Sequence, residues 1–493
     1  MKILNIHAGT NDDDIIKFIN ENVIPEAKKI SEGELKLKEN YSKCGQIFED
    51  TKLWVFLKEI NTCKSMGLIT ELMCKHSCQG SPLPDNIIFI ATCNPYRWKE
   101  KRYGTIEGKI GLNTNQTHPK LENSLEKEKE DIKIKKGKNL VYNVYPLPFS
   151  LLNFVFYFGD LKPEDERGYI SRMIRKVIEK INKEEKIKED CDKIIKIKEI
   201  ANNMLWNAIQ YIREKNDKST VSFREITKFN IFYEYFYYYL NLKKDYYLKE
   251  KHNEPNEDDK DFYEKLDVCT KQVYAINLSI FMACYLRISN EDQRKELNQK
   301  MNNILAQYND DFKVKNFLDL PLKEQKFIID NIKLDKDIVK DGALLENVFS
   351  LFININCKVP IFIFEKSGDS KSLSMQLIIN SMKGTASNNP FFKKLPKIIV
   401  HYYQCSLSSK SKEIKMIFDK SRETLSFLSE EDKKKNISLV FIDKMERAAL
   451  SVNNPLKVIN KEVECDQIKV EDQIAFVGLS KENLDDAPKM NKE

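Results

Sequence analysis

The stretch from Ile361 to Leu373, IFIFEKSGDSKSL, constrains the fold of this chain more than any other feature. Four apolar residues, Ile361 to Phe364, predict a short buried strand. A loop containing Gly368 follows, and Lys371 and Ser372 open a segment whose apolar residues have helical spacing. Phosphate-binding loops have this order. Their backbone N–H groups cradle phosphate, the lysine neutralises phosphate oxygens and the serine hydroxyl binds Mg²⁺.

The match to the consensus G-x-x-x-x-G-K-[ST] is partial. Glu365 stands at the first glycine position and Ser370 at the second, while Gly368 lies between them. Ser370 restricts the positive-φ conformations that glycine adopts without cost. The alternative interpretation of Lys371 is an ordinary lysine at the start of a helix.

The charge balance bears on the class of partner. The 493 residues carry 81 basic and 75 acidic side chains, a net charge of +6, and only 11 of the basic residues are arginine. Surfaces with mixed charges and many lysines are well solvated, whereas recognition of nucleic-acid bases relies mainly on arginine. We therefore expect no specific nucleic-acid partner. The length allows roughly two to four domains, and 41% hydrophobic residues are typical of a globular protein.

The cysteines and apolar runs bear on the compartment. Cys74, His76 and Cys78 form a tight group, but no second ligand pair follows at zinc spacing, so the group is more often incidental than metal-binding. Scattered thiols without a signal peptide favour a reducing, cytoplasmic location. The longest apolar runs, such as Leu147 to Phe158, fall short of the ~20 residues that span a membrane.

Polar residues follow two predicted strands in the N-terminal part. A first strand, Ile3 to Ile6, precedes a helix capped by Thr10 or Asn11. The segment Leu53 to Cys63 contains an apolar strand that ends in Lys58 and Glu59, and the segment Asn86 to Arg97 contains a buried strand that ends in Asn94 and Pro95. In an AAA+ core the corresponding strand ends offer an Asp for Mg²⁺, a Glu that polarises water and a sensor Asn. Glu59 and Asn94 fit, but Lys58 occupies the Asp position. The alternative is two core strands that happen to end in polar residues.

The middle of the chain is predicted to be helical. Residues 121 to 139 are a charge run without an apolar face and predict a solvated insertion. Helical periodicity dominates residues 164 to 300, and the aromatic residues from Phe232 to Tyr239 indicate core packing rather than a ligand platform. Lys243 to Asp261 and Lys313 to Asp341 are predicted to be connections. Together these segments predict an all-helical lid or small subdomain.

The C-terminal part repeats the earlier organisation. A helix from Leu344 to Phe352 precedes the phosphate-loop strand, and three further strands are predicted, the second of which ends in Asp443. Their ranges are Ile398 to Tyr403, Leu439 to Ile442 and Ile474 to Leu479. A strand ending in an acid is again followed by a strand ending in a polar residue. This internal repeat strengthens the interpretation of Lys371 as a phosphate-binding residue.

These segments resemble the mysterin family of giant AAA+ proteins with a RING-type E3 ubiquitin ligase module. The matching segments cover most of the chain, and CNPYR (Cys93 to Arg97) and PLPFSLL (Pro146 to Leu152) are quite specific. Other matching segments include VFLKEINTC (Val55 to Cys63), PLPDNIIFIATCNPYR (Pro82 to Arg97), VYPLPFSLLNFVFYFGDLKPEDER (Val144 to Arg167), SGDSKSLS (Ser367 to Ser374) and FVGLS (Phe476 to Ser480).

The resemblance implies an α/β fold with P-loop AAA+ three-layer αβα cores. Residues 1–120 would be the back of one core, 121–139 a charged insertion, 140–340 the helical lid and connection, and 341–493 the front of a second core. The first phosphate loop would lie upstream of Met1 or come from a partner chain. The chain has no RING framework, so it is expected to be a fragment without ligase activity of its own, with neighbouring AAA modules and possible ubiquitination machinery as partners.

The resemblance also implies roles for single residues. Glu59, Asn94 and Arg224 would be the water-activating carboxylate, the sensor and the lid arginine of the first module. In the second module Gly368, Ser370, Lys371 and Ser372 would bind the phosphates of ATP, and Ser372 with Asp443 would hold Mg²⁺.

Departures from the family pattern lower the expected turnover. Lys58 and Lys444 replace an Asp and the catalytic Glu, and Ser480 replaces the sensor Asn. Glu446 lies beyond the strand end, so its rescue of the missing carboxylate is not expected. The sequence therefore favours ATP binding with weak or absent hydrolysis. The alternative is a non-catalytic structural or regulatory fragment with decayed nucleotide sites.

Overall fold

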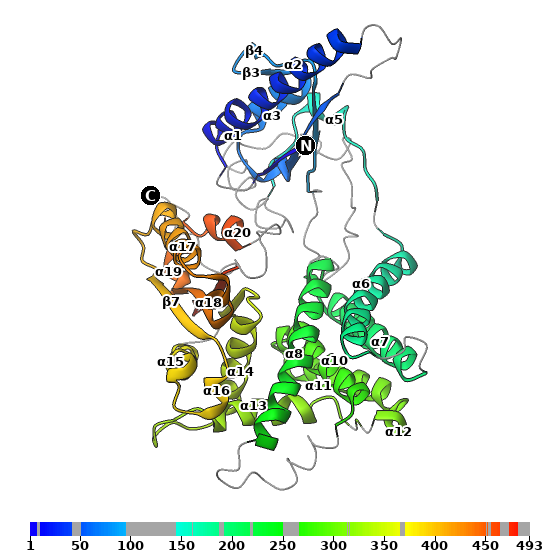
Figure 1. The fold of residues 1–493 in the computed structure, drawn as a ribbon, viewed down its shortest axis with the longest axis vertical. Coiled ribbons are helices and arrows are strands. Elements are labelled where there is room, and N and C mark those ends of the chain that lie inside the picture. The colour runs from blue at the N-terminus through cyan, green and yellow to red at the C-terminus, as the bar shows by residue number, and fades with distance from the viewer. Residues whose placement is uncertain are drawn as a thin grey trace, which may run out of the picture. The chain divides into compact units, whose positions relative to one another are not determined.

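The computed structural model describes most of the chain, in two compact units, Met1–Gly159 and Asp160–Glu493. The described residues are 1–6, 10–41, 51–94, 144–159, 161–186, 192–216, 220–249, 266–312, 314, 316–364, 370–449, 451, 455–463 and 473–481. The predicted charged insertion, residues 121–139, lies outside them. Each unit is described by itself (Figure 1).

The first unit is built on a three-stranded parallel sheet of order β1-β2-β5. β1 spans Lys2–Asn5, β2 spans Leu53–Lys58 and β5 spans Ile87–Ala91. The predicted strands are present. β1 is shifted by one residue toward the N-terminus, β2 ends at Lys58, and β5 ends at Ala91, before the predicted end at Asn94. A short antiparallel pair, β3 (Ser77–Cys78) and β4 (Ser81–Pro82), stands apart from this sheet.

Helices cover one face of this sheet. Asn11 caps the first helix, because its Oδ1 accepts the N–H of Asp14 at 2.9 Å. Val55 and Leu57 of β2 are fully buried in a cluster with Ile15, Ile19 and other helix residues. The helical elements of this unit are α1 (Asp12–Phe18), η1 (Ile19–Val23), α2 (Ile24–Tyr41), η2 (Ile60–Thr62), α3 (Met66–Thr70), η3 (Glu71–Lys75) and α5 (Phe149–Leu152).

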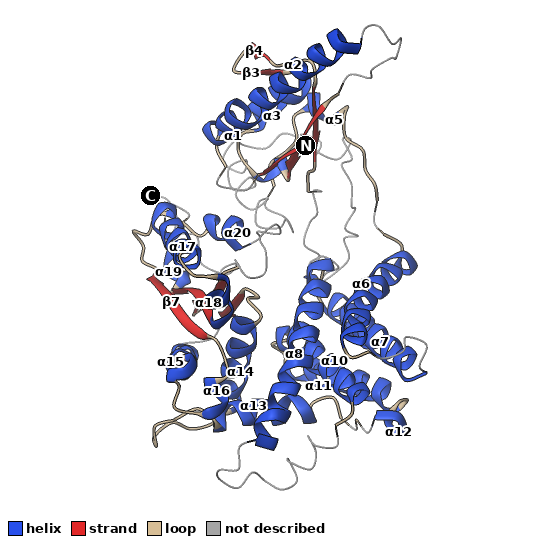
Figure 2. Cartoon of the chain, viewed as in Figure 1, coloured by secondary structure: helices blue, strands red, loops and turns tan. Residues whose placement is uncertain are grey.

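The second unit begins with a group of helices, shown in blue in Figure 2. Pro163 starts the first of them, as predicted. The helices are α6 (Pro163–Glu184), α7 (Asp192–Lys215), α8 (Phe223–Lys249), α10 (Val268–Ala283), η6 (Tyr285–Arg287), α11 (Glu291–Ala306), α12 (Asn309–Phe312) and α13 (Asp319–Asp330).

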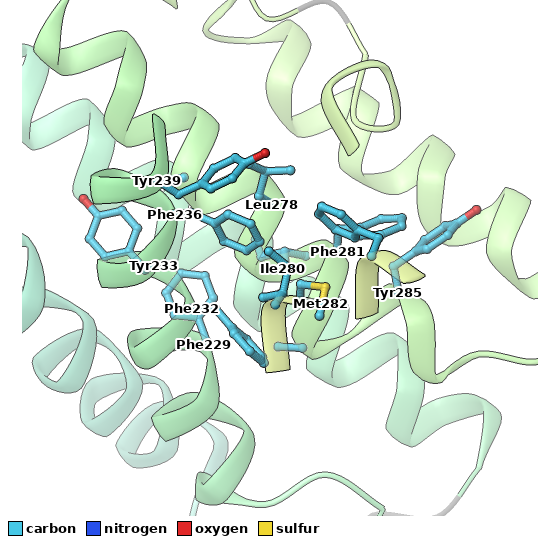
Figure 3. Packing of buried hydrophobic residues seen from close by; sticks show 14 of the residues in the cluster. Phe229, Phe232, Tyr233, Phe236, Tyr239, Leu278, Ile280, Phe281, Met282 and Tyr285 are labelled. Carbon is cyan, nitrogen blue, oxygen red and sulfur yellow. The ribbon is translucent and has the colours of Figure 1, made fainter. Parts of the chain in front are cut away.

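The aromatic residues of α8 form core, as the sequence predicted. Phe229, Tyr233 and Phe236 are at most 1% exposed. They pack toward α10, where Phe281 lies beside them (Figure 3). Phe236 also stacks on Phe349, with ring centroids 6.3 Å apart. This aromatic core therefore joins the helices to the elements that carry the second sheet.

Two predicted connections are wrong in part. α8 continues through Lys243 to Lys249, and α13 lies inside the segment from Lys313 to Asp341. The polar composition of both segments gave no indication of the buried ion pair between them. Lys243 Nζ lies 2.7 Å from Glu324 Oε2, and both side chains are 0% exposed. A lysine whose charge is paired inside the protein does not mark a solvated segment.

The second sheet has four parallel strands in the order β6-β9-β8-β7. They span Ile361–Phe364 (β6), Lys397–Gln404 (β7), Asn436–Asp443 (β8) and Ala475–Ser480 (β9), and all four were predicted within about three residues of each end. Such a sheet, with helices between its strands, gives the mixed α/β class that the sequence predicted.

Helices lie on both faces of this sheet. One face packs on α14 (Gly342–Asn356), which in turn packs against α15 (Lys371–Ser381), in the large cluster that includes Leu439 and Val477. The other face, with Val440 and Phe476, packs on α17 and α20. The remaining elements are η7 (Gly384–Ala386), α16 (Pro390–Lys393), α17 (Ser411–Ser426), α18 (Glu430–Lys435), α19 (Met445–Ala449) and α20 (Lys457–Val463). In the described part of the chain no helix is both long and apolar enough to cross a membrane.

Candidate functional site

The carboxyl ends of the parallel strands gather polar residues from distant parts of the sequence. In the second sheet, β6 ends at Phe364, directly opposite Ser480 of β9. β8 ends at Asp443, opposite Gln404 of β7. Parallel α/β sheets bind ligands outside the carboxyl ends of their strands. This edge is therefore the candidate site of the second unit.

Lys371 and Ser372 stand at the start of the helix that follows β6, as predicted. α15 begins at Lys371, whose side chain is 8% exposed, and Ser372 is exposed. The carbonyl of Ser370 accepts the N–H and the hydroxyl of Ser374 at 2.7 and 2.8 Å, which anchors the first turn. Gly368 lies outside the described residues.

Asp443 and Lys444 follow each other at the end of β8. Asp443 is half-buried, and its Oδ1 accepts the backbone N–H of Lys444 at 2.8 Å. Lys444 has a φ of 57°, a left-handed conformation that a side-chain-bearing residue seldom adopts. This turn ends the strand and allows the next helix, α19, to begin at Met445.

The first sheet repeats this turn. Glu59, the residue after β2, has a φ of 55°. The pair Lys58 and Glu59 thus corresponds in position to Asp443 and Lys444. The sheet orders agree as well, since β1-β2-β5 corresponds to β7-β8-β9. Each module therefore has one acidic and one basic residue at this strand end, in opposite order.

The structure brings the segments of Glu59 and Asn94 together. The backbone N–H of Glu59 donates to Thr92 Oγ1 at 3.0 Å. Asn61 holds the backbone of Asn94 from both sides: its Oδ1 accepts the Asn94 N–H at 2.9 Å, and its Nδ2 donates to the Asn94 carbonyl at 2.8 Å. Asn61 is 1% exposed, so this contact is an internal part of the fold.

Arg224 belongs to the second unit and lies at the start of α8. It is exposed, and its backbone N–H donates to Ser222 Oγ at 3.3 Å. Its neighbour Glu225 is buried and pairs with Arg287 at 3.1 Å. Burial alone would raise the pKa of Glu225, but Arg287 and the N–H of Ser222 outweigh it and hold the pKa below its usual value.

Three residues at these strand ends escaped sequence reasoning. Asn61 and Thr92 position the backbone of the predicted residues, and asparagine or threonine near a strand end is too common to signal such a role. Glu446 lies beyond β8, so the sequence predicts no role for it at the site. Its Oε2 nevertheless accepts the N–H of Lys481 at 3.1 Å and the hydroxyl of Ser480 at 3.3 Å.

In the described part of the chain, Cys74, His76 and Cys78 do not come together as a group that could hold a metal ion. No cluster of metal-ligating side chains occurs in the described ranges. Cys74 Sγ donates to the Ser150 carbonyl at 3.7 Å, and His76 Nε2 contacts the Pro84 carbonyl at 3.0 Å.

The residues at the second sheet fit a phosphate group with its metal ion. Lys371 offers a cation and Ser372 a hydroxyl, and Asp443 offers a carboxylate, a ligand type that Mg²⁺ prefers. Ser370 Oγ is buried and, among the described residues, has no hydrogen-bond partner. A buried hydroxyl in that position is suited to a polar ligand. The first sheet fits a metal less well, because Lys58 stands where the metal-binding carboxylate would be.

Comparison with known proteins identifies the relatives of this chain. Residues 337–493 match the family model of the RNF213 AAA domain. The whole chain is 28% identical to E3 ubiquitin-protein ligase rnf213-beta of Danio rerio and 26% identical to E3 ubiquitin-protein ligase RNF213 of Homo sapiens and of Mus musculus. It spans 9% of the length of each. The chain is thus similar over its full length to one segment of the RNF213 proteins, and the predicted resemblance to the mysterin family is confirmed.

Proposed function

We propose that this chain is part of an AAA+ motor region and binds ATP with Mg²⁺ at the strand ends of the second sheet, with slow hydrolysis. In this proposal Gly368, Ser370 and Lys371 bind phosphate, while Ser372 and Asp443 hold the metal. The observation that carries it is the helix start at Lys371, directly after the loop that follows β6. A helix start presents unpaired N–H groups and a partial positive charge to an anion.

Lys444 is the reason to expect slow hydrolysis. It occupies the position that corresponds to Glu59, and an ammonium group cannot take a proton from water as a carboxylate does. General acid–base catalysis contributes roughly 10²–10⁴-fold to a rate. Loss of the base at this position therefore leaves a nucleotide that is bound for long periods, which is suited to a structural or regulatory module.

The first sheet has an open face that supports a partner with a phosphate loop. Trp54 and Ile90 are 46% and 44% exposed, whereas the corresponding Leu439 and Val477 are fully buried, on strands that contact α14. Among the described residues, β5 also has no second strand beside it, although β9 pairs with β6. We propose that a helix–strand–helix segment of a neighbouring module or partner chain completes this core. Glu59, Asn94 and Arg224 would then serve its nucleotide.

Further roles follow from the relatives. The helices from α6 to α13 would form the lid, and the domain boundaries near residues 120, 140 and 340 stay predictions. The relatives are named as E3 ubiquitin-protein ligases, so contact with ubiquitination machinery and a cytoplasmic location are part of the proposal. The alternative, a structural fragment without a working nucleotide site, is favoured by the lysines at positions 58 and 444.

Isothermal calorimetry of the full chain with ATP and Mg²⁺ tests the proposal. Loss of one charged contact costs about 1.5–3 kcal/mol, so Lys371→Ala should weaken binding by roughly 10–150-fold. Lys383→Ala is the matched control, because Lys383 is exposed and lies beyond the other end of α15. Equal affinity of the Lys371 variant and the control would refute the site. Absence of binding by the folded wild-type chain would favour the structural fragment.

A further inference from the structure

A carboxylate lies at the end of β9, although its residue follows β8 in sequence. The left-handed turn at Lys444 reverses the chain after Asp443, and α19 begins at Met445. Glu446 therefore lies at the end of β9, the strand that pairs with β8. Its Oε2 accepts the backbone N–H of Lys481 at 3.1 Å and the hydroxyl of Ser480 at 3.3 Å.

The register of the sheet places this carboxylate close to the phosphate-loop strand. Ser480 pairs with Phe364, the last residue of β6, and is 2% exposed. β9 lies between β6 and β8, so Glu446 stands at the strand that separates Asp443 from the loop after Phe364. A carboxylate is thus present at this edge even though Lys444 is not acidic.

Gly478 makes this arrangement possible. A Cβ at position 478 would lie 2.5 Å from Met445 Sδ and 2.9 Å from Phe362 Cδ1, both too close for a real contact. The missing side chain allows Met445 to pack directly on β9. Because Met445 is buried and adjacent to Glu446, this packing fixes where the carboxylate lies.

We propose that Glu446 takes the role that Lys444 cannot fill, and orients and deprotonates the water that attacks the γ-phosphate of ATP. This inference rests on the proposed ATP site. Both hydrogen bonds to Glu446 end on Oε2, and in the described part of the chain none ends on Oε1. Oε1 is the atom assigned to the water.

The step balances without a further reactant. The water oxygen forms a bond to the γ-phosphorus while Glu446 takes one water proton. The bond between that phosphorus and the β–γ bridging oxygen breaks, and its electron pair stays on ADP. The slow turnover proposed above is then the turnover of a base displaced from the position of Lys444, and the two hydrogen bonds to Oε2 orient Oε1 toward the water.

The competing role for Glu446 is to tie α19 to the end of β9. A purely structural role predicts that Glu446→Gln lowers the melting temperature and the ATP affinity together. The proposed role predicts unchanged ATP affinity, a phosphate-release rate at least about 10²-fold lower, and a loss of binding to ADP with aluminium fluoride, which mimics the transferring phosphoryl group. Glu446→Asp should restore part of the rate. Glu431→Gln is the control, because Glu431 is an exposed carboxylate of α18, and it should keep both ATP affinity and rate.

The outcomes separate this inference from the proposed function. No ATP binding by the wild-type chain would refute both. ATP binding without any release by the wild type, or release that Glu446→Gln does not slow, would refute the role of Glu446 alone. If Glu446→Gln fails to fold, Ser480→Ala tests the role of Glu446 instead. Removal of the hydroxyl that contacts Glu446 should slow phosphate release by about 10-fold without changing ATP affinity. An unchanged rate in that variant would refute the role.

Discussion

The buried pair of Lys243 and Glu324 gives a stability prediction with a definite size. Both side chains are 0% exposed, their charged atoms are 2.7 Å apart, and the hydroxyl of Tyr239 donates to the same carboxylate oxygen at 2.8 Å. Lys243 Nζ also lies 3.9 Å from the ring centroid of Phe327. Lys243→Ala leaves a buried carboxylate without its cation, which typically costs about 3–5 kcal/mol.

Urea unfolding of the full chain, followed by the fluorescence of its aromatic core, measures this cost. With a slope of about 3 kcal/mol per molar urea, the midpoint should fall by about 1–1.7 M. Lys295→Ala is the control, because its partner Asp292 is 3.7 Å away and the two side chains are 76% and 86% exposed. Such an exposed pair contributes at most about 1 kcal/mol.

A double variant tests whether the unpaired charge of Glu324 causes the loss of stability in Lys243→Ala. Lys243→Met together with Glu324→Gln removes both charges and keeps an acceptor for Tyr239. Replacement of a buried ion pair by uncharged groups is often neutral, so the double variant should regain most of the lost stability. If it is as unstable as Lys243→Ala, packing rather than the unpaired charge causes the loss. If Lys243→Ala matches the Lys295 control, the pair is not buried and the account of α8 is wrong.

Three further predictions concern the sheets. Leu439→Ala should cost about 2–5 kcal/mol in urea unfolding and Trp54→Ala less than about 1, because only the first is covered; equal costs would contradict the open face of the first sheet. Gly478→Ala should cost about 1–3 kcal/mol, since its Cβ would meet Met445. Burial lowers the pKa of His401 below its usual value of 6.5. As the pH falls, the unfolded chain therefore takes up a proton at this residue before the folded chain does. The free energy of unfolding should then decline as the pH falls from 6.5 to the folded-state pKa. His401→Gln should flatten this decline.

The strands could be predicted because their apolar runs are short and sharply bounded. Ile361–Phe364 appears with the predicted ends, and Asn11 caps α1 as one of two predicted candidates. The strand from Leu53 ends at Lys58, within one residue of the predicted end, but the left-handed turn at Glu59 that ends it was not predicted. The conformation of a single residue produces no periodic pattern in the sequence, so the turn at Glu59 could not be predicted.

Only those site residues whose positions depend on neighbouring sequence could be predicted. Lys371 and Ser372 could be placed at a helix start because they follow a strand and a loop. Glu446 could not be placed, because its position depends on the turn at Lys444 and on room left by Gly478 in another strand. The buried state of Lys243 was hidden for a similar reason, since its partner Glu324 is 81 residues away in the sequence.

The nucleotide content of the purified chain is the most direct test of ATP binding at Lys371. The full chain is incubated with ATP and Mg²⁺, separated from free nucleotide, and denatured with acid, and the released nucleotide is identified and counted. The account predicts one nucleotide per chain, still largely ATP after several minutes, and almost none for Lys371→Ala. Nucleotide retained equally by Lys371→Ala, or none retained by the wild type, would contradict it.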